Sequence, residues 1–495
     1  MAAVVSHPGA RRWAFRRALG ERIPAAALTA CVIVMCAVAT ALHPPIDPDL
    51  GWHLRSGMFI LGSHSVPSTD FMSFTAAGQP WFANEWLWDL TIAALYRAAG
   101  AVGLLASTAL VMTLVSTFVF LTARSRALPP LGCCAAMALA LANLKPMVDV
   151  RPALAGAALT AAFVWILERY AFQPRSILAL TALEILWVNV HGSFVLGIAL
   201  VALYAVSGTW SWPLHLRLLP LAPIAFVSTS LATVINPRGV SLWGFIISAS
   251  RLSFNRQFVL AWRPFDIHDP SLAFTTATLA AMALAAALAA KQRKLTLPLP
   301  AAALLVGGTL AVIRSLEFLP LFAVATAPTL PSLLPPLLTG RDRPRIPRWE
   351  AVAAVGTGAA VVLAACASLS AARYQGTESK VFPVAAAAAI QKGALQGPLF
   401  NAFNWGGYVA WALPSNPQFV DSRTELYGPG LLNDYMKAAG GDTAVLDHYR
   451  VALVLIETGS PLDRQLAGLP RWERYYADAQ SVVYQRTSPV EGATS

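Results

Sequence analysis

The sequence predicts a polytopic α-helical membrane protein with about 11 transmembrane helices, followed by a soluble C-terminal α/β domain. Of its 495 residues, 56% are hydrophobic and only 12% are charged, whereas about a quarter of the residues of a soluble domain are charged. The apolar residues form long blocks, such as 24–42, 272–290 and 351–369. Each block approaches the ~20 residues that cross a bilayer as a helix.

The basic residues indicate which side of the membrane each segment faces. They gather in short segments between the apolar blocks, at Arg11, Arg12, Arg16, Arg17 and Arg22, at Arg124 and Arg126, at Lys291, Arg293 and Lys294, and at Arg341, Arg343, Arg345 and Arg348. Cytoplasmic loops carry such an excess of Lys and Arg. The net charge of +11 therefore indicates orientation and not a nucleic-acid partner. We predict a bacterial inner-membrane protein with segment 1–23 in the cytoplasm and its C-terminal domain in the periplasm, or otherwise outside the cytoplasm.

Residues 24–372 form the predicted transmembrane domain. Its spans are expected near 24–43, 103–122, 131–147, 152–169, 176–190, 193–209, 218–235, 272–290, 297–313, 315–333 and 350–371. A long outer loop, 43–100, follows the first span. The soluble domain is 373–495, where the apolar runs shorten to strand length. Helices are expected there at 384–392 and 407–413, and strands at 398–403, 418–420, 451–456 and 481–485.

The start of the first outer loop carries the strongest candidates for chemistry. Asp47 and Asp49 directly follow the first span, with His53 and Arg55 close behind. Acidic groups at a membrane face are costly unless they are solvated or paired, so they are candidates for function. Either carboxylate would serve as a general base toward a hydroxyl group or hold a divalent cation such as Mg²⁺ or Mn²⁺. Alternatively, both cap the helix that follows.

Further candidates lie later in the same loop and near the middle of the chain. Glu85 and Asp89 are four residues apart, on one face of a helix, within an aromatic segment that is also typical of an interfacial belt. Asn189 and His191 interrupt a long apolar run. Such a break lines a cavity or is buried in protein, so the two side chains are either site residues or a packed pair.

Basic residues at the outer ends of spans oppose the general trend; they are Lys145, Arg151, Arg238, Arg263 and Arg314. Each alone is explained by snorkelling, but several together favour a lipid-phosphate site, with Arg151 and Arg314 as its expected ligands. In the soluble domain, Trp405 and Tyr408 precede a helix, and Asp421 and Arg423 follow a strand. These four residues either contact a ligand or pack against the membrane domain.

Several classes of protein are disfavoured. The five cysteines all lie in apolar segments, without the spacing of a metal site or a disulfide framework. No Gly-x-x-x-x-Gly-Lys-Ser/Thr, His-Glu-x-x-His or Gly-x-Ser-x-Gly motif is present. ATP hydrolysis, zinc proteolysis and α/β-hydrolase chemistry are therefore not expected.

In order and topology, these motifs resemble the GT-C superfamily of membrane glycosyltransferases. Asp47-Pro48-Asp49 with Trp52–Arg55 is similar to its acidic first outer loop. Other matching segments, similar to a poorly characterised bacterial branch, are Arg151-Pro152, 187–192, Asn236-Pro237 and Arg314 with 318–320. Trp405–Tyr408 with Asp421 and Arg423 is similar in placement to the Trp-Trp-Asp region of oligosaccharyltransferase catalytic subunits. Gly406 and Gly407 stand where that motif has Trp and Asp, which argues against protein N-glycosylation.

The resemblance implies that a sugar passes from a polyprenyl-phosphate or pyrophosphate carrier to a glycan, lipid or protein acceptor on the outer side of the bilayer. Asp47 or Asp49 would be the catalytic or metal-holding acid. The other candidates would bind the substrate or the lipid phosphate. A flippase for a lipid-linked glycan and a non-catalytic envelope-assembly protein remain alternatives, although internal repeats and mid-span charges typical of transporters are not evident.

Overall fold

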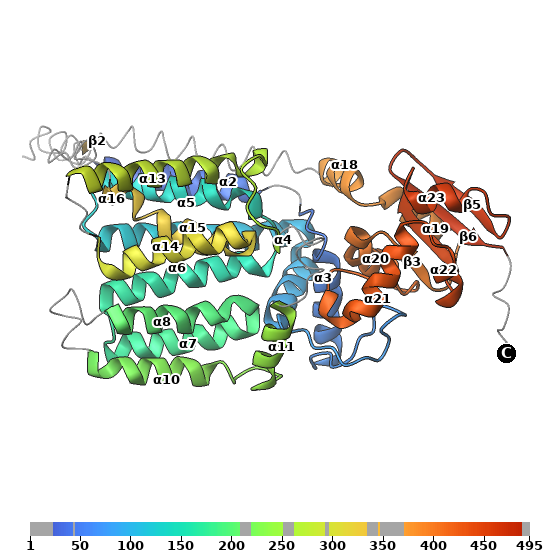
Figure 1. Cartoon of the computed structure of the whole chain (residues 1–495), viewed down its shortest axis with the longest axis horizontal. Helices are drawn as coiled ribbons and strands as arrows, with labels where there is room; N and C mark the ends of the chain where they lie inside the picture. Colours follow the sequence, from blue (N-terminus) through green and yellow to red (C-terminus); the bar gives the residue numbers. More distant parts are fainter. Residues whose placement is uncertain are drawn as a thin grey trace, which may run out of the picture.

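The computed structural model describes residues 23–42, 45–207, 219–250, 262–292, 297–333, 345–346 and 371–487. A bundle of helices forms one end of the molecule and a small mixed domain, here called the outer domain, forms the other (Figure 1). Helix α3 (Leu50–Ser63) and the start of α4 (Trp86–Ser125) lie between the two. The residues that the sequence singles out in the first outer loop are therefore at the junction of the two parts.

The bundle is built from apolar, alanine-rich helices with little polar surface. Apart from α4, its helices are α2 (Ala25–Ala41), α5 (Pro130–Leu144), α6 (Pro152–Tyr170), α7 (Pro174–Val190), α8 (Val195–Ser207), α10 (Ala222–Ala232), α11 (Ser241–Ser250), α13 (Ala273–Gln292), α14 (Leu299–Arg314), α15 (Leu319–Thr326) and α16 (Leu330–Leu333). Pro lies at the first turn of α5, α6, α7 and α14. The backbone N–H groups of that turn have no acceptor within the helix, so Pro, which has no N–H, is favoured there.

The predicted number of spans is not confirmed. Among the described residues, three helical segments are long and apolar enough to cross a membrane: Trp86–Ser125, Pro152–Tyr170 and Pro270–Leu288. Six more apolar helices have 10–17 residues, below the ~20 of a typical span. The span expected at 350–371 lies almost wholly outside the described residues.

The first outer loop contains more helix than the sequence suggests. Helix α4 begins at Trp86, well before the span expected at 103–122, and bends at Gly100, whose φ of +57° is left-handed. Glycine adopts that conformation without strain. Apolar side chains before and after the bend obscure it in the sequence, so the boundary expected at 100 is a kink at which two helices meet without a loop between them.

A half-buried polar network holds the opposite end of the bundle together. Arg126 donates two hydrogen bonds to the Glu168 carboxylate, and its side chain also reaches Thr329 Oγ1 at 2.6 Å. Tyr204 donates to the same carboxylate at 2.9 Å. Because a buried charge is stable only when it is paired and hydrogen-bonded, this network fixes α4, α6 and α8 relative to one another.

The outer domain has a four-stranded sheet in the order β3 (Leu399–Asn401), β4 (Leu453–Glu457), β6 (Ser481–Arg486), β5 (Trp472–Ala477). The β3–β4 pair is parallel and the others are antiparallel. Its helices are α18 (Ala371–Val381), α19 (Val384–Lys392), α20 (Gly406–Ala412), α21 (Thr424–Ala439), α22 (Ala444–His448) and α23 (Pro461–Leu466). The α/β class is as predicted.

Two strand assignments differ from the prediction. The strand expected at 418–420 is reduced to one bridging residue, Gln418, which pairs with both Leu399 and Ser73. Strand β5 was not expected, because exposed polar side chains at Glu473 and Arg474 give it no apolar face. An edge strand with one solvated face does not show the apolar run on which the assignment depends.

The outer domain is joined to the first outer loop by a continuous set of contacts. Trp52 Nε1 donates to Ser422 Oγ at 3.0 Å, and Phe74 N–H donates to the Gln418 carbonyl at 3.1 Å. Ala76, from the loop, is part of the hydrophobic core of the outer domain. The loop and the outer domain therefore form one structural unit.

The first outer loop and the outer domain approach each other closely at Gly51 and Gly407, in a backbone contact that only glycine allows. A Cβ on Gly51 in α3 would fall on the carbonyl oxygen of Gly407, whereas one on Gly62, in the same helix, meets nothing within 4 Å. Gly51→Ala should therefore lower the free energy of unfolding by about 1–3 kcal/mol through overpacking. Gly62→Ala should be neutral or slightly stabilising, since Ala is the better helix former. Thermal unfolding in detergent measures both, and equal effects would contradict the contact.

Candidate active site

The site begins with the two acids that follow α2. Asp47 is buried and forms an ion pair with Arg151, with Oδ2 at 3.0 Å from Nε. Its other oxygen accepts the backbone N–H of Asp49 at 2.9 Å. Asp47 is therefore engaged at both oxygens, and its part is to hold Arg151 and the turn that carries Asp49.

Asp49 is the less constrained of the pair. It precedes α3 but makes no side-chain cap hydrogen bond to that helix, so the capping interpretation does not describe its geometry. Burial and the neighbouring Asp47 raise the pKa of Asp49 above the ordinary value of an aspartate, against the opposing effects of a hydrogen bond with Ser422 and of Arg151. A carboxylate with a raised pKa is a better proton acceptor near neutral pH.

His53 lies one turn further along α3 and joins two other acids. Its Nδ1 is 2.5 Å from Asp89 Oδ1, and its Nε2 is 3.7 Å from Glu85 Oε2. Burial alone would lower the pKa of His53, but Asp89 and Glu85 outweigh it and raise the pKa to about 9. Glu85 and Asp89 thus meet opposite nitrogens of one imidazolium.

His191 approaches Glu85 from the other side. Its Nε2 is 3.6 Å from Glu85 Oε1 and 3.7 Å from Glu317 Oε1, while its Nδ1 accepts the backbone N–H of Ser193 at 3.2 Å. That bond requires an unprotonated Nδ1, so the ring proton is on Nε2. Burial, Arg151 and His53 lower the pKa of His191 to about 3. His191 is therefore a neutral N–H donor between two carboxyl groups.

Two acids of this cluster were not predicted from the sequence. Glu317 follows α14, and Glu425 opens α21 in the outer domain. Burial raises the pKa of Glu425 to about 7, with Asp49 contributing in the same direction. An acid at the end of an apolar span was the available signal for Glu317, whereas nothing local in the sequence places Glu425 beside Asp49.

The remaining candidates from the first loop and the bundle lie apart from the acids. Arg55 donates to the carbonyls of Ala410 and Pro414 at 2.7 and 3.3 Å, so it attaches α3 to the outer domain. Asn189 accepts a hydrogen bond from Trp86 Nε1 at 2.6 Å and donates to two backbone carbonyls. Both polar atoms of its side chain therefore have partners, as in a packed side chain. Arg314 is exposed at the end of α14.

The four candidates from the outer domain have contacts typical of packing. Trp405 is buried and donates to the Val381 carbonyl at 3.0 Å. Tyr408 stacks on Phe382 with ring centroids 5.0 Å apart. The last two, Asp421 and Arg423, form a buried ion pair that also includes Asp70 of the first loop and so joins that loop to the outer domain.

Of the two acids expected to hold a divalent cation, Asp49 is the one with fewer side-chain contacts. Asp47 has both oxygens occupied by Arg151 and the Asp49 N–H, which leaves Asp49 alone of the expected pair. Within the described ranges, no three His, Cys, Asp or Glu side chains are grouped to hold a metal ion.

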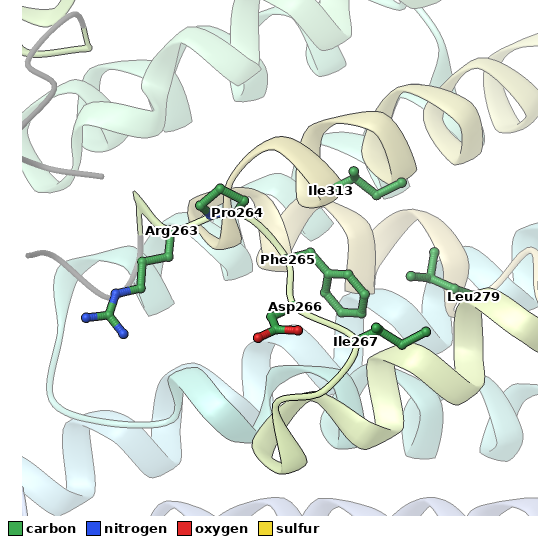
Figure 2. Close-up of a pocket in the computed structure, with 7 residues that line it drawn as sticks. All are labelled: Arg263, Pro264, Phe265, Asp266, Ile267, Leu279 and Ile313. Carbon is green, nitrogen blue, oxygen red and sulfur yellow. The ribbon is translucent and has the colours of Figure 1, made fainter. Parts of the chain in front are cut away.

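An open crevice of about 720 Å³ lies elsewhere, beside α13 and α14 (Figure 2). Its lining includes Phe265, Ile267, Leu279 and Ile313, and the Arg263 side chain points away from them. The crevice shares no lining residue with the acid cluster. It therefore does not take part in the site.

Solved structures identify the architecture. ArnT from Cupriavidus metallidurans, in a structure bound to undecaprenyl phosphate, superposes with a TM-score of 0.50 at 15% identity, over 94% of this chain and 98% of ArnT. The apo oligosaccharyltransferase of Archaeoglobus fulgidus does so with a TM-score of 0.50 at 11% identity, over 86% of this chain and 69% of its own. The chain has the GT-C fold.

The likeness is one of fold and not of close sequence. No protein-family model matches the chain, and no curated protein matches it either. The GT-C fold is shared over nearly the whole length, including the outer domain, since the superposition with ArnT leaves out only a small part of either chain. Because one fold hosts many activities, the chemistry of the site depends on its own residues.

Proposed function

We propose that the protein is a membrane glycosyltransferase that moves a sugar from a polyprenyl-phosphate or pyrophosphate carrier to an acceptor hydroxyl group. The observation that carries the proposal is the acid cluster at the junction of the bundle and the outer domain, with Asp49 next to the Asp47–Arg151 ion pair. The GT-C fold, shared with a protein whose structure contains undecaprenyl phosphate, supports a polyprenyl carrier.

The two halves of the reaction fall to different residues. Asp49 accepts the proton of the acceptor hydroxyl group, because its raised pKa favours proton uptake near neutral pH. Arg151 is 21% exposed and stays charged beside Asp47, so it is available to bind the phosphate of the carrier. An arginine matches phosphate geometry with two parallel hydrogen bonds.

The identity of the sugar does not have to be established before this proposal is tested. The purified protein is incubated with a total lipid extract from the host membrane, which supplies polyprenyl-phosphate-linked sugars, and with an envelope fraction, which supplies acceptor hydroxyl groups. Free polyprenyl phosphate is then measured by mass spectrometry. Release above that of a heat-inactivated sample is expected. An absence of release from every donor, with extract known to support another transferase, would contradict the function.

We also propose that the site faces the extracytoplasmic side, because Arg124 and Arg126 lie at the opposite end of α4 from Glu85 and Asp89. Alkaline phosphatase, which is active only outside the cytoplasm, should be active when fused after Thr487 and inactive when fused after Arg126. The reverse pattern would place the acids in the cytoplasm and reject this orientation.

A further inference from the structure

Glu85 is the point at which two imidazole rings converge. His53 Nε2 lies 3.7 Å from one of its carboxyl oxygens and His191 Nε2 lies 3.6 Å from the other. The rings come from α3 and from the turn after α7, elements far apart in the sequence. Both nitrogens carry hydrogen, since Asp89 holds a protonated His53 and Ser193 occupies Nδ1 of His191.

Exposure distinguishes the roles of these groups. The side chains of His53 and Asp89 are 2% and 0% exposed, whereas that of Glu85 is 22% exposed. Glu85 is therefore the member of the group that a substrate can reach. His53, which is paired with the buried Asp89, contacts one carboxyl oxygen of Glu85. His191 contacts the other oxygen and so fixes the orientation of the carboxyl group.

The surroundings of Glu85 favour a bound proton at neutral pH. Burial, opposed by His53 but reinforced by Asp89, Glu317 and Asp49, raises the pKa of Glu85 to about 8. When the proton leaves, the positive charge of His53, 3.7 Å away, stabilises the carboxylate that remains. A carboxylic acid that holds its proton at neutral pH and lies beside a positive charge is suited to general-acid catalysis.

We infer that Glu85, held between His53 and His191, is a second acid of the reaction and donates its proton to the departing phosphate oxygen. This assignment rests on the proposed function. It divides the work between two carboxyl groups, with Asp49 on the acceptor side and Glu85 on the carrier side. His53, Asp89 and His191 are positioning residues in this scheme.

The proton and bond changes balance between the two substrates and the two carboxyl groups. The acceptor O–H bond breaks as its proton passes to the Asp49 carboxylate, and the oxygen forms a bond to the anomeric carbon. The bond from that carbon to the phosphate oxygen breaks, and this oxygen takes the Glu85 proton. Asp49 then returns one proton to Glu85 through water, which restores the starting state.

Glu85→Gln is the direct test, with Glu317→Gln as its matched control. Glu317 has nearly the same exposure, 23%, and the same contact with His191, but it does not contact His53. In the lipid-extract assay, Glu85→Gln should lower the rate about 10²–10⁴-fold, and Glu317→Gln should lower it far less. The wild-type rate should fall as pH rises through about 8, where Glu85 loses its proton, and the residual rate of Glu85→Gln should lack this fall.

Two measurements separate failure of the inference from failure of the function. Infrared difference spectra between pH 6 and pH 10 should show a carboxylic-acid band in the wild type that is weaker in Glu85→Gln, where other acids such as Glu425 still contribute, whether or not turnover is detected. Binding of undecaprenyl phosphate and the melting temperature should be unchanged in Glu85→Gln. If Asp49→Asn abolishes release while Glu85→Gln keeps the full rate, or if the band keeps its full wild-type intensity in Glu85→Gln, the inference is overturned and the function stands. If the wild type releases nothing, both fall.

Discussion

Asp49→Asn should reduce sugar transfer by about 10²–10⁴-fold, the range typical of the loss of a general base. Asparagine has the shape of aspartate, but its amide does not take up a proton. Because Asp49 makes no cap hydrogen bond to α3, the melting temperature should change little. The rate is measured as release of polyprenyl phosphate, and the protein level by immunoblot.

The matched control is Asp266→Asn, which changes an exposed acid of the separate crevice. It should leave the rate within about two-fold of the wild type, because a surface substitution away from a site has little effect. Retention of near-normal transfer by Asp49→Asn would remove it from the reaction. In that case Glu425, which lies within electrostatic range of Asp49, would be the next residue to test.

Arg423→Ala should lower the free energy of unfolding by about 3–5 kcal/mol, because it leaves buried carboxylates without their partner. The guanidinium lies 2.6 Å from Asp421 and 2.9 Å from Asp70, and it stacks at 4.4 Å over the Trp81 ring. All three charged side chains are at most 2% exposed. Arg423 therefore connects the outer domain to the first loop across a dry contact.

Thermal unfolding in detergent measures this loss, and Lys437→Ala serves as its control. Lys437 pairs with Asp434 at 3.0 Å, but its side chain is 51% exposed. An exposed pair contributes only about 0–1 kcal/mol. A normal melting temperature with abolished transfer in Arg423→Ala would show instead that Arg423 acts on the substrate, as the sequence resemblance implies.

The pattern of apolar and polar residues predicted much of the fold, because buried positions are apolar and can be located in the sequence. Apolar blocks marked the helices of the bundle, and Val384–Lys392 in the outer domain is a helix within the bounds expected. The prediction failed where the apolar pattern does not mark the boundary or the strand. The bend at Gly100 lies within an apolar run, and β5 has exposed charged residues.

The sequence by itself determined that two acids directly follow the first apolar block, and it made them candidates because a carboxylate beside a bilayer is costly without a role or a partner. Only the tertiary structure decided which acid is free to react. Arg151, about a hundred residues away, occupies Asp47 and leaves Asp49. His191 likewise approaches Glu85 only because the helices pack side by side. Charge pairing acts over a few ångströms in space, whatever the separation along the chain.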